Sequence, residues 1–178
     1  MYLSLAVLVL FSVWYVFSID PEAREIPAQS EGSPDYYMEG FLATSFNDKG
    51  MIKHRFGAQR MAHYPVNQRA ELTGVLIVAD SDDQGQWEIR AGKGVTSYGS
   101  DIIDLSEDIQ VQRTDIMHGP TIETAALKVD SGNRYASTQY PVRIHAENAV
   151  IKSMGVYIDF SQREIQLTSQ VRGKYNVP

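Results

Sequence analysis

The chain of 178 residues contains no cysteine, which excludes disulfide bonds, thiolate nucleophiles and cysteine-ligated metal sites. It also lacks a run of basic side chains: 16 Lys and Arg stand against 22 Asp and Glu, and the net charge is −6. Nucleic acids and anionic lipid headgroups attract basic segments, so the composition indicates no nucleic-acid partner. Residues 1–19 carry no Asp, Glu, Lys, Arg or His, so the charge belongs to the rest of the chain.

An uncharged apolar segment opens the chain. The 18 residues from Tyr2 to Ile19 are rich in Leu, Val and aromatic side chains. As a helix they span about 27 Å, close to the ~30 Å hydrocarbon core of a bilayer. The alternative, a cleaved signal peptide, needs a charged start and a small-residue cleavage site, and neither is present. We therefore expect residues 1–19 to form a single uncleaved transmembrane helix.

A linker and one further domain follow. Residues 20–34 hold Pro21, Pro27 and Pro34 among Ser, Gly and Glu, with little apolar material to pack, which is typical of an extended linker. From Asp35 onward apolar and polar residues alternate, most clearly at 51–58, 87–91, 142–147 and 165–171. This period of two predicts half-buried antiparallel strands, and we expect residues 35–178 to form one β-domain.

A repeat supports the strand interpretation. Apolar-x-apolar-x-small motifs end at Ala58, Ala91, Thr124 and Ala146, spaced 33, 33 and 22 residues apart. Such spacing predicts hairpins stacked side by side, with end strands that lack a second neighbour unless the array closes into a barrel. The segment Asp101–Arg113 fits both a helix face and a strand, and the repeat favours a strand.

No set of side chains supplies catalytic chemistry. The histidines, His54, His63, His118 and His145, have no helical metal-ligand spacing. The pair His145 and Glu147 and the acidic turn 80–83 are more typical of solvated surface than of metal sites. Ser97 is not in a nucleophile elbow, and no phosphate-binding glycine loop is present. We predict a binding protein with no catalytic residues, no metal and no cofactor.

Three segments near the C-terminus resemble a known family: Pro141–Ile144, Ile151–Phe160 and Ile165–Tyr175, which contains Val-Arg-Gly-x-Tyr. With the apolar start, the Pro-rich linker and the unit Trp87–Ala91, their order is similar to that of the LptC family of lipopolysaccharide export proteins. The resemblance covers nearly the whole chain. It implies an open, V-shaped β-jellyroll of stacked antiparallel hairpins, which holds the acyl chains of lipopolysaccharide in an apolar groove.

The resemblance also implies sites and partners. The expected groove residues are the alternating apolar set Phe41, Phe56, Leu72, Leu76, Trp87, Ile89, Ile103, Leu105, Ile109, Ile144, Ile158 and Leu167. Among them, Phe41 and Leu72 match positions at which the family's groove is lined. The expected docking edge is the last strand, with Ile165, Leu167, Ser169, Val171, Gly173 and Tyr175. Its alternation places Ile165, Leu167 and Val171 inward.

The family's role makes the expected partners specific. An inner-membrane ABC transporter, bound by the helix and the N-terminal strand, supplies lipopolysaccharide, and the bridge protein LptA receives it at the C-terminal strand. The expected location is the inner membrane, with the β-domain in the periplasm. The alternative function is a membrane-tethered periplasmic scaffold with a closed core and no lipid cargo.

Overall fold

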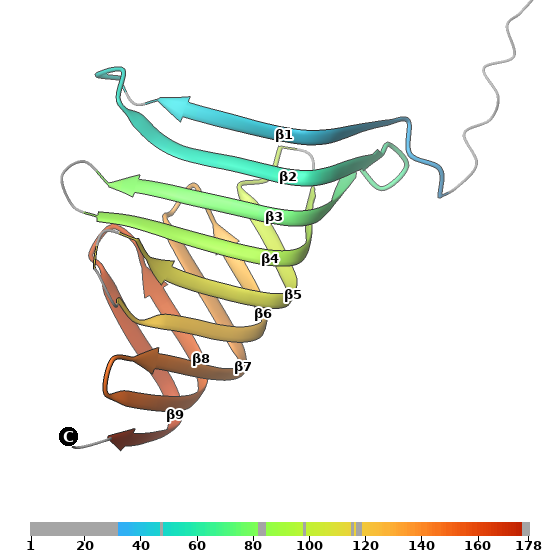
Figure 1. The fold of residues 1–178 in the computed structure, drawn as a ribbon. Helices are drawn as coiled ribbons and strands as arrows, with labels where there is room; N and C mark the ends of the chain where they lie inside the picture. The colour runs from blue at the N-terminus through green and yellow to red at the C-terminus, as the bar shows by residue number, and fades with distance from the viewer. Residues whose placement is uncertain are drawn as a thin grey trace, which may run out of the picture. The chain divides into compact units, whose positions relative to one another are not determined.

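Nine antiparallel strands make up the part of the chain that the structure describes. This computed structural model describes residues 32–178 except 47, 82–84, 98, 115, 117–118 and 176–178. The strands are β1 (Tyr36–Phe46), β2 (Ile52–Tyr64), β3 (Arg69–Ser81), β4 (Gly85–Ser97), β5 (Ile102–Arg113), β6 (Thr121–Asp130), β7 (Tyr135–Ala146), β8 (Ala149–Asp159) and β9 (Glu164–Tyr175). They form one sheet in chain order (Figure 1), so β1 and β9 are its two ends.

The all-β prediction is confirmed for these residues, and the ambiguous segment 101–113 is strand β5. Residues 34–178 form one compact unit. The predicted transmembrane helix at 1–19 and nearly all of the predicted linker lie outside the described residues. Within the described ranges, no helix has the length and apolar character needed to cross a membrane.

Most strands are interrupted near their middle by an irregularity in pairing. The register shifts between Arg90 and Lys93 on β4, and corresponding shifts lie at 106–109, 124–128, 138–141 and 152–154 on β5 to β8. On β1 and β3 the register does not shift at this level, but Gly40 and Gly74 lie there with left-handed φ values of 60° and 62°. A bulge bends its strand and increases the local twist. A row of bulges across neighbouring strands therefore folds the whole sheet along one line.

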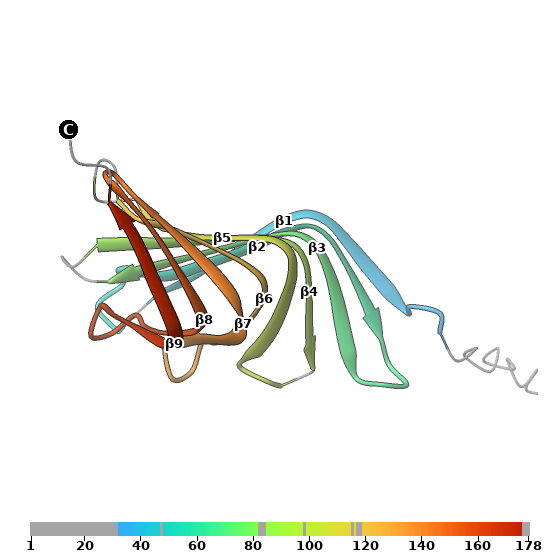
Figure 2. The same ribbon diagram turned by 90° about the horizontal axis from the view of Figure 1, so that it is seen from below.

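The fold line divides the sheet into two walls (Figure 2). The first wall comprises residues 41–46, 52–58, 75–81, 85–91, 109–113, 121–124, 141–146, 149–153 and 171–175. The second wall comprises residues 36–39, 60–64, 69–73, 93–97, 102–106, 126–130, 135–138, 154–159 and 164–169. Each of the nine strands contributes residues to both walls.

Apolar side chains from both walls fill the space between them. Val111 of the first wall and Ile158 of the second are fully buried, both with 0% of their surface exposed. Trp87, on the first wall, packs edge-on against Phe160, which follows the second-wall part of β8, with ring centroids 5.7 Å apart. Contacts of this kind close much of the interior into a continuous core.

The bends also explain the small residues of the sequence repeat. Ala58 and Ala91 both pair with Val75, one from each side, and Thr124 lies at the same level beside the next bulge. The spacing of 33 residues therefore corresponds to the chain length from one strand to the next strand but one, as from β2 to β4. The fourth member, Ala146, departs from this pattern because it pairs with Ala149 at the end of β7.

Buried hydroxyl groups at the bends are hydrogen-bonded. Thr124 donates its hydroxyl to the carbonyl of Pro141 at 3.1 Å, and Ser153 donates to the carbonyl of Gly155 at 2.8 Å. A bulge leaves backbone groups without ladder partners, and a short hydroxyl side chain can pair with them without leaving the interior. The hydroxyl groups of Thr124 and Ser153 therefore satisfy backbone carbonyls along the fold line.

Candidate functional site

An apolar cavity of about 320 Å³ lies between the two walls. The first wall contributes from β1 to β4, and the second contributes from β5, β6 and the turns that follow β6 and β8. The lining residues are Ala43, Thr44, Ser45, His54, Phe56, Ile77, Ala79, Ile89, Ile103, Val129, Asp130, Ser131, Arg134 and Phe160. Most of these side chains are hydrophobic, so the cavity suits an apolar ligand or part of one.

Polar groups gather on the turn that follows β6. The carboxylate of Asp130 accepts hydrogen bonds from the backbone N–H of Asn133 at 2.8 Å and from its side-chain amide at 2.9 Å. The backbone hydrogen bond from Asn133 is the main cause of a pKa of Asp130 below its usual value. The Asp130 carboxylate is thus occupied by its own turn.

Arg134 is the cationic residue of the cavity lining, and its guanidinium forms no ion pair within the described ranges. An apolar cavity beside an uncommitted guanidinium fits an amphiphile with an anionic group. The acyl part would contact Phe56, Ile77 and Ile89, and the guanidinium would meet the charge.

Eleven of the twelve predicted groove residues fall into three groups. Phe56, Ile89 and Ile103 line the cavity. Six more belong to the closed core, where they are at most 6% exposed: Leu72, Trp87, Leu105, Ile109, Ile144 and Ile158. Phe41 and Leu167 are half-buried and pack against that core. The remaining residue, Leu76, is placed differently.

Leu76 lies on the outer face of β3. It pairs with Gly57 and Arg90, while its neighbours Val75 and Ile77 belong to the core cluster. Successive strand residues point to opposite faces, so Leu76 points away from the interior.

Leu72 is only 2% exposed in the closed core. A carboxylate at position 72 would therefore unfold the protein before it reported on ligand binding.

The sequence interpretation missed Ala43, Ile77, Ala79, Val129 and Phe160, which all line the cavity. Residues 75–79 form an unbroken apolar run, so alternation could not show which members face inward. The pairing of Ile77 with Phe56 and Ile89, which were both recognised as inward, is the signal that identifies it once strands are aligned.

The two end strands each have one hydrogen-bonded neighbour. On β1, Tyr37 and Leu42 are 62% and 61% exposed, and on β9, Tyr175 is 72% exposed. Ile165 and Leu167 face the core as expected, but the expectation for Val171 is wrong because this side chain is 52% exposed. The shift in β8–β9 pairing between Lys152 and Met154 breaks the alternation just before Val171.

The described residues contain no group of three His, Asp or Glu side chains placed to hold a metal ion. His145 contacts Glu123 across β6 and β7, at 3.3 Å between Nε2 and Oε2, on an exposed surface. His145 is the residue that the sequence analysis considered together with Glu147, and in the structure it contacts Glu123. Among the described residues, the candidate functional features are therefore the cavity and the outer edges of β1 and β9.

These features define a class: an open β-jellyroll module with an apolar interior and, among the described residues, an end strand on each side that is paired along one edge only. A family model described as "Lipopolysaccharide-assembly, LptC-related" matches residues 3–176. The chain belongs to the LptC family, as its sequence resemblance implies, and thereby has a role in lipopolysaccharide transport.

Comparison with solved structures agrees on the fold. The chain is similar to LptH of Pseudomonas aeruginosa, described as the LptA-homologous periplasmic component of the lipopolysaccharide transport device. The TM-score is 0.53 at 5% sequence identity, covering 70% of this chain and 95% of that one. A search among curated proteins found no match.

Proposed function

We propose that this chain is a non-enzymatic carrier that binds lipopolysaccharide delivered by an inner-membrane ABC transporter and relays it to the bridge protein LptA. The apolar cavity beside Arg134 is the observation that carries this proposal. Lipopolysaccharide combines acyl chains with anionic groups, and each buried methylene contributes ~0.8 kcal/mol. A volume of about 320 Å³ is at the lower end of the range for ligand cavities, so it suits an acyl chain rather than the whole glycolipid.

The free edges support the relay. A strand added to β9 would form backbone hydrogen bonds with net contributions of ~0.5–1.5 kcal/mol each, which suits a transient contact. We assign β9 to LptA and β1, which follows the N-terminal segment, to the transporter. Residues 1–19 would hold the chain in the inner membrane as a single-pass helix and leave residues 35–178 in the periplasm.

Site-specific photo-crosslinking tests the cargo. A crosslinker at Phe56, in the cavity, should give a product that contains lipopolysaccharide. The matched control is Leu76, which lies on the neighbouring strand and is half-buried but faces outward. Equal labelling from both positions, or none from Phe56, would refute the cavity as the cargo site.

A cavity-filling variant complements the crosslink. Ala79→Phe places a ring in the cavity, and it should lower lipopolysaccharide binding while the circular dichroism spectrum stays that of a β-protein. Ala126→Phe, at a half-buried position that does not line this cavity, is the control. Unchanged binding by Ala79→Phe would argue for another site.

The alternative is a membrane-tethered scaffold without cargo, and the closed core favours it to a degree. Six of the twelve predicted groove residues are at most 6% exposed and do not line the cavity, so much of the interior has no room for a ligand. Under this alternative, neither the Phe56 crosslink nor the Ala79→Phe variant would respond to lipopolysaccharide, whereas partners would still bind the edges.

A further inference from the structure

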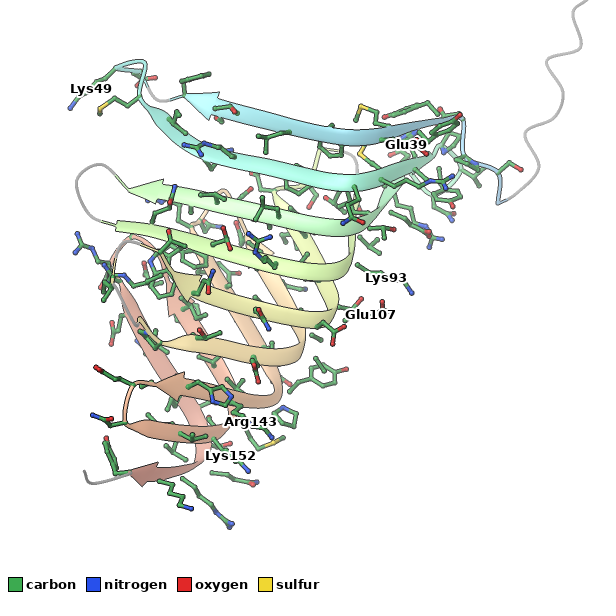
Figure 3. All side chains as sticks on the ribbon, viewed as in Figure 1. Glu39, Lys49, Lys93, Glu107, Arg143 and Lys152 are labelled. Atoms are coloured by element: carbon green, nitrogen blue, oxygen red, sulfur yellow. The ribbon has the colours of Figure 1, made fainter. Side chains whose placement is uncertain are left out.

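Three basic residues form one row across the last three strands. Arg143 on β7 pairs with Lys152 on β8, and Lys152 pairs with Arg172 on β9. All three side chains are exposed, and Lys174 lies two residues further along β9. Figure 3 shows Arg143 and Lys152 close together at the β7–β8 end of the sheet. This cationic row (Arg143, Lys152 and Arg172) contrasts with the net charge of −6.

The row is not neutralised by the rest of the described sheet. None of its members forms an ion pair with a described residue. Glu123 pairs with Arg143 in the β6–β7 register, but its carboxylate contacts His145 instead. Like charges directly opposite each other across strands are destabilising. Folding therefore does not account for the row.

Protection of the edge accounts for only part of it. Basic side chains on an edge strand discourage unwanted pairing, which would explain Arg172 and Lys174 on β9. Arg143 and Lys152, however, lie on strands that already have two neighbours. The three residues also border a cleft of about 960 Å³ that crosses β5 to β9, with Glu107, Asp108 and Glu123 towards its β5–β6 end. The basic end of this cleft leads to the free edge.

We propose that the cationic row is an electrostatic docking surface for an acidic edge strand of the partner jellyroll. A strand that pairs with β9 places its own side chains beside Arg172 in the same row, where Asp or Glu would neutralise the charges. The inference rests on the proposed function, because it specifies the chemistry of the partner that binds β9.

Lipopolysaccharide phosphates are the other anionic candidate, and the geometry disfavours them. Arg143 lies between Val142 and Ile144, which both belong to the core cluster, so its side chain is on the opposite face of the strand. Cargo inside the cavity would not reach that face, whereas a strand added to β9 continues the sheet and presents alternate side chains on that face, beside Arg172.

Association kinetics test the proposal with the full chain and LptA from the same organism as the probe. The double variant Lys152→Glu/Arg172→Glu should lower the association rate about tenfold at low salt, with a smaller effect on dissociation. The difference should vanish near 1 M salt, where the screening length is about 3 Å. The conservative double variant Lys152→Arg/Arg172→Lys should associate like the wild type.

The matched control is Lys49→Glu/Arg163→Glu, which changes the net charge equally at exposed turn positions outside the row. It should associate within about twofold of the wild type. An equal loss in both charge-reversal variants would reduce the effect to net charge and overturn the proposal. So would unchanged association of the Lys152/Arg172 variant, or a loss of lipopolysaccharide binding in its place. Failure of the wild type to bind LptA would instead refute the partner assigned under the proposed function, and this inference with it.

Discussion

Gly155, on the fold line, should tolerate an added side chain poorly because both its backbone conformation and a neighbouring backbone oppose it. It lies on β8 with a φ of 82°, and an added Cβ would stand 3.0 Å from the backbone oxygen of Thr138 and 3.0 Å from the hydroxyl of Thr168. A left-handed conformation costs an L-residue about 1–2 kcal/mol. Overpacking adds about 1–3 kcal/mol, because the Thr138 oxygen is part of the backbone of β7 and cannot rotate away.

Together these costs predict that Gly155→Ala lowers the free energy of unfolding by about 2–5 kcal/mol. For a unit of this size each kcal/mol shifts Tm by roughly 2–4 °C, so Tm should fall by about 10 °C. The assay is thermal unfolding followed by circular dichroism. Guanidinium unfolding should give the same order of variants with an unchanged slope.

Two other glycines separate the contributions. Gly40 has a φ of 60° but nothing within 4 Å of its Cβ position, so Gly40→Ala should show the conformational cost alone. Gly173 has no left-handed φ, and its nearest contact is an ordinary 3.8 Å, so Gly173→Ala should be nearly neutral. If Gly155→Ala and Gly40→Ala have the same Tm, the predicted steric cost at Gly155, from the close approach of Thr138 on β7 and Thr168 on β9, is refuted.

Three further predictions follow from other contacts. Trp87→Ala should lower the free energy of unfolding by about 3–5 kcal/mol, because it removes a side chain that is 3% exposed and packs against Phe160; a melt within 2 °C of the wild type would contradict this. The hydrogen bond between His63 and Asp35, at 2.7 Å, holds the pKa of Asp35 below 3.8. The bond therefore stabilises the start of β1 above pH 3.8, and this stabilisation is lost as the pH falls through the lower pKa of the folded state. Carboxyl NMR titration should therefore show the pKa of Asp35 rising towards 3.8 in His63→Ala, and an unmoved titration would exclude the contact. Lys152→Gln should leave Tm equal or higher, since it relieves repulsion from Arg143 and Arg172, and a clear fall in Tm would show that the row is structural.

Local alternation determined much of what the sequence reveals. A period of two needs only neighbouring residues, so it identified the strands around Phe56 and Ile89 and the inward faces of both. The sequence also revealed the spacing of 33 residues, because paired strands have similar lengths. This spacing places Ala58 and Ala91 at one level of the sheet. Family membership followed from the order of such segments.

Only the tertiary structure decided which inward residues meet a cavity and which meet a closed core. Phe56 and Leu72 are both inward, but Phe56 lines open space and Leu72 is 2% exposed, because different parts of the two walls oppose them. Bulges ended the alternation before Val171, and the unbroken run 75–79 concealed the inward face at Ile77. The cationic row joins residues from three strands whose alignment depends on register. Each of these features arises from contacts between segments far apart in the chain, and a period in the sequence records only what neighbouring residues do.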